Sequence, residues 1–187
     1  MTTEMNPNQN QNPQPDHIRR AAAVTLLILD VDGVLTDGSL TYGADGEVTK
    51  TFNVLDGLGI ELLQKTGVAV AIISARKSPV VVRRAADLKI QHVYQGNHDK
   101  RIAFADLLAS TGASVDQCCY IADDVIDLPL LRKVGFAVTV PSGHPDVRHR
   151  AHYVTVASGG RGAVREVCDM LMRAQGNYDA ALAPYFE

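Results

Sequence analysis

Short apolar runs alternate with longer segments of helical pattern along most of the chain. The apolar runs are residues 24–29, 68–73, 118–122 and 136–140, with a further short run near His92. Short continuous apolar strands separated by helices are typical of a parallel sheet covered on both faces. We therefore predict an α/β fold, with a Rossmann-like parallel sheet and helices on both of its faces.

The segments between these runs carry the start and stop signals of helices. Residues 56–67 end in a glycine that suits a helix C-cap, residues 78–88 open with Ser-Pro, and a third helix is expected to begin at Asp99. Each of these connections fits a βαβ unit.

One segment departs from this alternation of strands and helices. Residues 39–54 alternate apolar and polar positions around a Gly-Ala-Asp-Gly turn, which predicts a β-hairpin inserted after the first strand as a flap. The Asn-, Gln- and Pro-rich residues 1–16 are predicted to be a disordered tail. We expect residues 17–175 to form one domain without a further inserted domain, and residues 176–187 to be a flexible tail.

Length and charge narrow the function classes. With 187 residues, 46% of them hydrophobic, the chain fits one domain with a full core. The formal charge of −3 provides no basic field, so neither a nucleic acid nor a membrane is expected as a partner. No stretch reaches the roughly 18 apolar residues of a membrane span, and we expect a cytoplasmic protein. The three cysteines form no C-x-x-C pair and are interpreted as reduced core thiols.

The most apolar strand runs directly into acidic residues, in the sequence LLILDVDGVLTDG. In extended chain Asp30 and Asp32 point to the same side, which suits a small hard cation. A buried carboxylate needs a cation or several hydrogen-bond donors. The alternative is that the two aspartates cap a turn before Gly33.

Further polar side chains follow the other predicted strands. Ser74 and Arg76 come after the second apolar run, Lys100 stands at a helix start, and an acidic group follows Ile121, comprising Asp123, Asp124 and Asp127. Ligands of open parallel sheets bind outside the carboxyl ends of the strands. The sequence therefore predicts one site at this edge.

In order along the chain, these groups resemble the four motifs of the haloacid dehalogenase superfamily of aspartate-nucleophile phosphatases. DVDGVLTDG, FNVLDGLGI, ISARKSP, DDVIDLP and GGRGAVREVCDMLMRAQG together extend the resemblance over residues 24–175. They are most similar to the capless branch that hydrolyses the phosphate ester of a sugar acid. Two positions depart from that pattern, since Ala122 replaces a common glycine and Leu58 a polar or aromatic residue.

The resemblance implies a mechanism for the acidic residues. Asp30 would attack phosphorus and Asp32 would serve as general acid and then as general base. Mg²⁺ would be held by Asp30, the backbone carbonyl of Asp32 and Asp123. Asp124 and Asp127 would support this site, with direct coordination left open as the alternative.

The remaining positions would handle the substrate. Ser74 would bond a phosphoryl oxygen and Lys100 would neutralise the reacting anions. The guanidinium of Arg76 suits a sugar-acid carboxylate. The resemblance further implies substrate contacts for Asn53, and for Arg84 in the site of a neighbouring subunit.

The substrate implied is 3-deoxy-D-manno-octulosonate 8-phosphate, whose hydrolysis feeds lipopolysaccharide synthesis. A nine-carbon keto-sugar acid 9-phosphate is the alternative substrate, and a non-catalytic oligomeric scaffold is the alternative class. The resemblance implies a homo-oligomer, expected to be a tetramer, in which hairpins restrict the site. Residues 157–166 would then reach a site entrance, or else form a flexible lead into the last helix.

Overall fold

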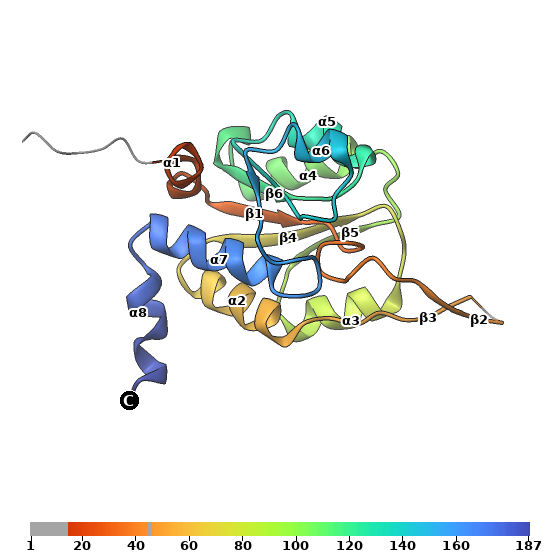
Figure 1. The fold of residues 1–187 in the computed structure, drawn as a ribbon, viewed down its shortest axis with the longest axis horizontal. Coiled ribbons are helices and arrows are strands. Elements are labelled where there is room, and N and C mark those ends of the chain that lie inside the picture. Colours follow the sequence, from red (N-terminus) through yellow and green to blue (C-terminus); the bar gives the residue numbers. More distant parts are fainter. Residues whose placement is uncertain (1–14, 45) are drawn as a thin grey trace, which may run out of the picture.

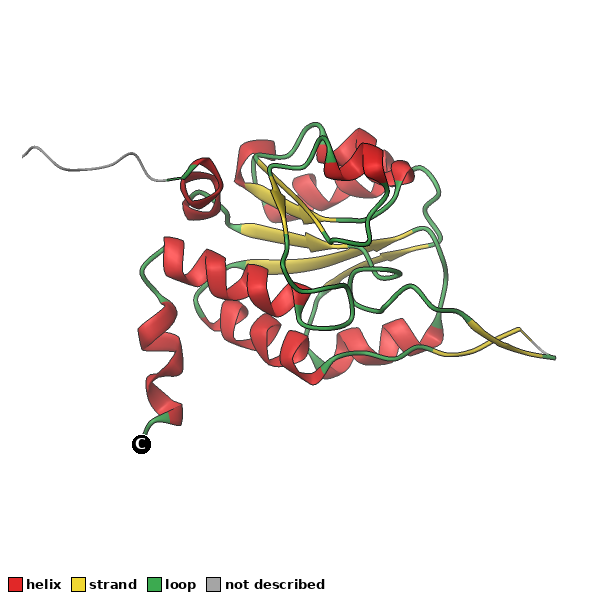
Figure 2. Ribbon diagram, viewed as in Figure 1, coloured by secondary structure: helices red, strands yellow, loops and turns green. Residues whose placement is uncertain are grey.

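A computed structural model describes residues 15–44 and 46–187, and this part of the chain forms three layers (Figures 1 and 2). A parallel sheet lies between two groups of helices, which confirms the predicted fold class. The order of its six strands is β5-β4-β1-β6-β7-β8, and every neighbouring pair is parallel. The strands are β1 (Leu26–Leu29), β4 (Ala69–Ser74), β5 (His92–Gln95), β6 (Cys118–Ile121), β7 (Phe136–Thr139) and β8 (Tyr153–Val154).

Helices connect the strands and cover both faces of the sheet (Figure 1). The longer ones are α2 (Val54–Lys65), α3 (Pro79–Asp87), α4 (Lys100–Thr111) and α7 (Ala163–Ala174). The shorter ones are α1 (Asp16–Ala22), α5 (Leu128–Leu131), α6 (Pro145–Arg148), α8 (Tyr178–Leu182) and the 3-10 turns Val115–Gln117, Val125–Asp127 and Ala183–Tyr185. No helix in the described residues is both long and apolar enough to cross a membrane.

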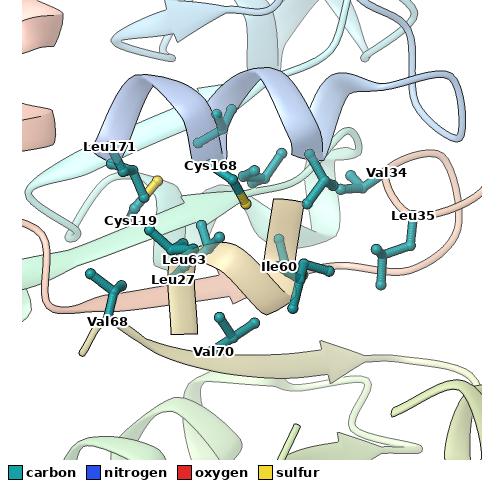
Figure 3. Close-up of a cluster of buried hydrophobic side chains, with 14 of the residues drawn as sticks. Leu27, Val34, Leu35, Ile60, Leu63, Val68, Val70, Cys119, Cys168 and Leu171 are labelled. Carbon is teal, nitrogen blue, oxygen red and sulfur yellow. The ribbon is translucent and has the colours of Figure 1, made fainter. Parts of the chain in front are cut away.

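The burial of the central strand β1 explains why its sequence is apolar at every position. Leu27 and Leu29 pack in the core between the sheet and α2 and α7, whereas Leu26 and Ile28 pack in the core on the α4 face. Figure 3 shows Leu27 in the first of these clusters. All four side chains are fully buried. Because successive strand residues point to opposite faces, a strand buried on both sides loses the usual alternation of apolar and polar residues.

The predicted helix signals fall at the observed helix ends. Pro79 is the first residue of α3, and the side chain of Asp99 caps α4 by accepting a hydrogen bond from the Arg101 N–H. The helix α2 begins two residues before the predicted start and ends at Lys65, with Gly67 in the left-handed region at φ +95° shortly after it. The starts of α3 and α4 mark the ends of the loops that follow β4 and β5 at the carboxyl edge of the sheet.

The predicted hairpin is present as β2 (Thr41–Gly43) and β3 (Gly46–Thr49), which pair antiparallel and extend away from the body (Figure 1). Asp45 of its turn, and residues 1–14 of the expected tail, lie outside the described residues. The C-terminal segment differs from the expected flexible tail. It folds as α8, because Tyr178, Ala181 and Leu182 bury apolar surface against the core.

Candidate active site

Asp30 lies at the carboxyl end of β1, at the bottom of a cavity. Its backbone N–H donates to the Ile121 carbonyl at 3.0 Å, which continues the pairing of β1 with β6 past the end of the strand. The carboxylate accepts a hydrogen bond from the Val31 N–H at 2.8 Å. Asp30 as a whole is only 7% exposed, so its carboxylate is held rigidly but still reaches the cavity.

Lys100 is a buried cation beside this carboxylate. It is the first residue of α4, and its Nζ lies 3.0 Å from Asp30 Oδ1 and 2.6 Å from Asp127 Oδ1. Burial by itself would lower the pKa of Lys100, but the neighbouring carboxylates of Asp30 and Asp127 raise this pKa overall. Lys100 is therefore a protonated ammonium fixed between two acids.

The hydroxyl of Tyr120 holds Lys100 and Asp127 in place, and the sequence analysis did not identify this residue. Its hydroxyl donates to Asp127 Oδ1 at 2.6 Å and accepts a hydrogen bond from Lys100 Nζ at 3.1 Å. Tyr120 and Asp127 are fully buried. The available signal was a tyrosine within an apolar strand, since a buried hydroxyl needs a partner.

Three carboxylates come together at this point. Ligand oxygens of Asp30, Asp123 and Asp127 lie within 4.8 Å of one another. The predicted ligands were the carboxylates of Asp30 and Asp123 and the backbone carbonyl of Asp32, so Asp127 is the addition. Burial raises the pKa of Asp30 to about 7, with Lys100 opposing this shift, and burial raises the pKa of Asp123 to about 6. The ionised forms thus need more positive charge than Lys100 supplies.

This donor set fits a hard divalent cation. Its ligands are all oxygens, and the three carboxylates exceed the single lysine by two negative charges. Asp127 uses one oxygen for Lys100 and Tyr120 and the other for the Asp124 N–H at 3.4 Å. These bonds favour Asp127 as a support for the site and leave Asp30 and Asp123 facing the cavity.

The cavity has a volume of about 300 Å³, and most of the predicted catalytic side chains line it. Its walls are Asp30, Asp32, Gly38, Ser74, Ala75, Arg76, Lys100, Asp123, Asp124 and Ile126. Two hollows are larger, one of about 360 Å³ beside α8 and one of about 520 Å³ beside the start of α4, but neither brings several carboxylates together. The chemistry is therefore concentrated at the carboxyl ends of β1, β4 and β6.

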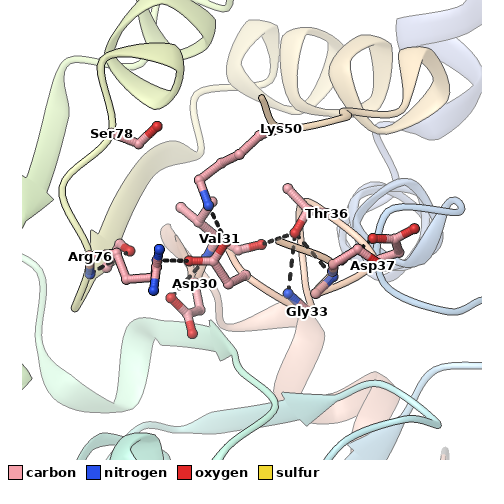
Figure 4. A network of polar contacts seen from close by, with 12 residues as sticks. Asp30, Val31, Gly33, Thr36, Asp37, Lys50, Arg76 and Ser78 are labelled. Carbon is pink, nitrogen blue, oxygen red and sulfur yellow. Dashed lines mark hydrogen bonds and ion pairs between the residues drawn. The ribbon is translucent and has the colours of Figure 1, made fainter. Parts of the chain in front are cut away.

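Arg76 lies over Asp32 and contacts the hairpin. Its Nε is 3.7 Å from Asp32 Oδ2, and its guanidinium donates to the Tyr42 hydroxyl at 2.8 Å. Figure 4 shows the Arg76 side chain in the polar network beside Asp30 and Lys50. The side chain of Tyr42 is largely exposed and serves as a hydrogen-bond partner of Arg76 rather than as a packing residue. The guanidinium stands at the cavity rim, where an anionic group could reach it.

Lys50 is a second site residue that sequence reasoning missed. It follows β3, is buried, and forms an ion pair and hydrogen bond with Asp32 Oδ1. Most lysines are exposed, and nothing in the hairpin sequence separates this one from a solvated lysine.

Two predicted substrate residues lie away from the cavity. Asn53 caps α2 by accepting a hydrogen bond from the Leu55 N–H at 2.7 Å, and Arg84 donates to the Asn53 carbonyl at 3.2 Å. Asp124 does line the cavity, and its side chain caps the turn Val125–Asp127. The substrate roles of Asn53 and Arg84 stay predictions.

The glycine-rich loop before α7 packs against the loop that follows Asp30. The Gly160 N–H donates to the Val34 carbonyl at 2.9 Å, and a Cβ on Gly160 would lie 2.6 Å from the Asp37 nitrogen. Asp56 of α2 caps α7 by accepting a hydrogen bond from the Arg165 N–H at 2.8 Å. These contacts favour a loop that supports the site over a flexible lead into the last helix.

Residues 84–166 match the family model of haloacid dehalogenase-like hydrolases, the class that this fold and carboxylate site define. Over 166 residues the chain is 50% identical to 3-deoxy-D-manno-octulosonate 8-phosphate phosphatase of Escherichia coli (strain K12), covering 89% of this chain and 88% of that one. The solved structure of this phosphatase from Yersinia pestis is 48% identical, with a TM-score of 0.86 over 88% of this chain and 89% of that one.

The phosphatase from Moraxella catarrhalis, solved with magnesium ion, phosphate ion and KDO molecule, is 41% identical. Its TM-score is 0.89, over 92% of this chain and 99% of that one. The chain belongs to the family of 3-deoxy-D-manno-octulosonate 8-phosphate phosphatases, and the resemblance inferred from its motifs is confirmed.

Proposed function

We propose that this protein hydrolyses 3-deoxy-D-manno-octulosonate 8-phosphate to the sugar acid and inorganic phosphate, in lipopolysaccharide biosynthesis. The observation that carries the proposal is Asp30, a buried carboxylate that opens into a cavity beside Lys100 and Asp123. Family membership at 50% identity over 89% of the chain supports the substrate.

Asp30 is the nucleophile of the first half-reaction in this proposal. A carboxylate oxygen of Asp30 forms a bond to phosphorus while the bond from phosphorus to the sugar oxygen breaks. Asp32 gives its proton to that departing oxygen. Lys100, at 3.0 Å from Asp30 Oδ1, neutralises negative charge so that two anions can approach each other.

Asp32 acts as a base in the second half-reaction. It takes a proton from a water molecule whose oxygen attacks phosphorus, and the bond between Asp30 and phosphorus breaks. Inorganic phosphate leaves, and both carboxyl groups return to their starting forms. One residue thus moves the proton in both directions.

Asp30 and Asp123 would hold Mg²⁺, together with the predicted backbone carbonyl of Asp32, and Asp127 would keep this set in place. When bound, Mg²⁺ supplies positive charge to the carboxylates and to the transferring phosphoryl group. The magnesium ion in the Moraxella catarrhalis phosphatase supports this choice of metal.

Ser74 and Arg76 would orient the substrate. The Ser74 side chain is buried at the wall of the cavity and has a hydroxyl to donate to a phosphoryl oxygen. Arg76 stands at the rim, where its planar guanidinium suits the substrate carboxylate. Asn53 would contact substrate, and Arg84 would do so in the site of a neighbouring subunit.

Phosphate release from a panel of substrates tests the proposal. The panel contains 3-deoxy-D-manno-octulosonate 8-phosphate, a nine-carbon keto-sugar acid 9-phosphate and plain sugar phosphates, each with Mg²⁺ and with chelator. A strong, metal-dependent preference for the 8-phosphate is expected. A preference for the 9-phosphate would identify that compound as the substrate instead. The absence of turnover with every ester would favour a non-catalytic scaffold.

We further propose a homotetramer in which hairpins of adjacent copies cover the site entrance. Apolar side chains are exposed on and beside the hairpin, namely Leu40, Tyr42, Val54 and Leu55. Apolar clusters of this kind often mark interfaces. Light scattering of the full chain should give four times the chain mass, and a monomer mass would contradict the proposal.

The cytoplasm is the proposed location, where thiols stay reduced. Cys118, Cys119 and Cys168 are all free and buried, which suits such an environment. Fractionation of the producing cells, followed by activity measurement, should recover the phosphatase with cytoplasmic markers.

A further inference from the structure

Lys50 is buried at the root of the hairpin. Its side chain is 1% exposed, whereas both neighbouring residues, Thr49 and Thr51, are exposed. Its Nζ donates a hydrogen bond to Asp32 Oδ1 and forms an ion pair with it. Because a buried ammonium is costly without an anionic partner, Lys50 and Asp32 hold each other in place.

Asp32 is held from two different parts of the chain. Lys50 reaches its Oδ1 from the hairpin, and Arg76 approaches its Oδ2 to 3.7 Å from the loop after β4. Figure 4 shows the side chains of Lys50 and Arg76 entering the network from different sides. The hairpin also contacts Arg76 through the Tyr42 hydroxyl, at 2.8 Å.

Lys50 differs from the other cations of the site because it does not line the cavity. Asp32, Arg76 and Lys100 line the cavity, whereas Lys50 is not among the lining residues and contacts Asp32 with a side chain that is almost fully buried. Its ammonium is therefore poorly placed to touch a substrate and well placed to act through Asp32.

We propose that Lys50 is the positioning residue for both proton transfers of Asp32. Its ammonium fixes Oδ1, and this presents Oδ2 first to the departing sugar oxygen and then to the attacking water. A general acid must stand within hydrogen-bond reach of the atom it protonates, and a charge-assisted bond fixes a carboxylate more firmly than a neutral one. The inference rests on the role proposed for Asp32.

The consequence depends on the leaving group. A sugar alkoxide needs a proton as it departs, whereas the nitrophenolate of p-nitrophenyl phosphate leaves without one. Loss of Lys50 should therefore slow formation of the aspartyl-phosphate from the sugar phosphate and spare its formation from the aryl ester. Hydrolysis of the aspartyl-phosphate needs Asp32 as a base and should be slow for both substrates.

The test compares Lys50→Met with the wild type in stopped-flow and steady-state assays, with Mg²⁺ present. For the 8-phosphate of the sugar acid, we expect kcat to fall by about 10²-fold, the scale of general acid catalysis. For p-nitrophenyl phosphate, we expect a burst of nitrophenolate equal to the number of active sites, followed by slow turnover. Lys133→Met, the same change at an exposed lysine, should behave as wild type.

Equal losses on both substrates without a burst would overturn the proposal, and so would an unchanged kcat on the sugar phosphate. If Lys50→Met alone does not fold, the pair Asp32→Asn and Asp32→Asn/Lys50→Met provides the test, because the double variant buries no unpaired charge. If Lys50 acts through Asp32, the single and the double variant should have the same burst rate. A further loss in the double variant would contradict the proposed role of Lys50. Failure of the wild type on the sugar phosphate would refute the proposed function, while the aryl ester would still report on Lys50.

Discussion

Gly33 leaves room for the carboxylate of Asp123, and the Cβ of any larger residue at position 33 would fill that space. A Cβ on Gly33 would lie 2.6 Å from Asp123 Cγ and closer still to Oδ2, and the backbone of Gly33 has a φ of +84°. The loop after β1 therefore approaches the loop after β6 through a glycine. This contact sets the position of a carboxylate proposed to bind Mg²⁺.

Replacing Gly33 should displace Asp123 and weaken the metal site. Gly33→Ala is expected to lower Mg²⁺ affinity and to reduce turnover by about 10²-fold, the scale of a misplacement near 1 Å. Gly67→Ala is the matched control, because Gly67 also has a positive φ, of +95°, but nothing lies within 4 Å of its Cβ position. Calorimetric titration with Mg²⁺ checks both variants, and equal affinities would contradict the assigned role.

Arg76 should matter most for substrates that carry a carboxylate. Arg76→Ala removes a charge-assisted hydrogen bond of the kind that contributes about 1.5–3 kcal/mol, so kcat/KM for the sugar-acid phosphate should fall about 10- to 100-fold. Sugar phosphates without a carboxylate should lose much less. Steady-state kinetics on both classes measures this, and equal losses would count against carboxylate recognition.

The metal-free site should make stability depend on pH in a defined direction. The pKa values of Asp30 and Asp123 are raised by burial to about 7 and about 6, so the folded state binds these protons more tightly than the unfolded chain. Their contribution stabilises the fold at low pH and is lost as the pH rises through 6 to 7. Mg²⁺ replaces the protons and should stabilise the fold more at pH 8 than at pH 5.5.

Thermal unfolding with Mg²⁺ and with chelator measures this difference at each pH. Comparing the melting temperatures with and without Mg²⁺ at one pH cancels the contribution of titrating groups that do not contact the metal. Asp123→Asn removes one proposed ligand and should shrink the Mg²⁺-dependent rise in melting temperature at pH 8. An equal or larger rise at pH 5.5 in the unmodified protein would show that these carboxylates do not govern the metal site.

The sequence predicted the strands and the catalytic edge because both leave local signals. A strand buried on two faces is continuously apolar, as in residues 26–29, and parallel topology brings the carboxyl ends together. Strand β8 was missed since two residues at a sheet edge leave no pattern. Helices α1 and α8 are stabilised by packing against distant segments, and short local windows do not show this.

The site residues missed from the sequence owe their roles to tertiary burial. Lys50 and Asp32 are 18 positions apart, and the lysine becomes a site residue only when the hairpin folds back. Tyr120 lies within an apolar strand, and its hydroxyl meets Asp127 and Lys100 only in the folded chain. Motifs predicted the groups proposed to contact substrate, and the structure added Lys50 and Tyr120, which hold some of these groups in place.

Whether Asp30 is the nucleophile of a Mg²⁺-dependent reaction can be measured as phosphate release from 3-deoxy-D-manno-octulosonate 8-phosphate by the wild type and by Asp30→Asn, each with Mg²⁺ and with excess chelator. The wild type should release phosphate rapidly, and only with Mg²⁺. Asp30→Asn should lose about 10⁴-fold or more, as expected for a nucleophile, while keeping its circular dichroism spectrum. Sustained release by a folded Asp30→Asn protein would contradict the role of Asp30 as nucleophile, and sustained release by the wild type in chelator would contradict the need for Mg²⁺.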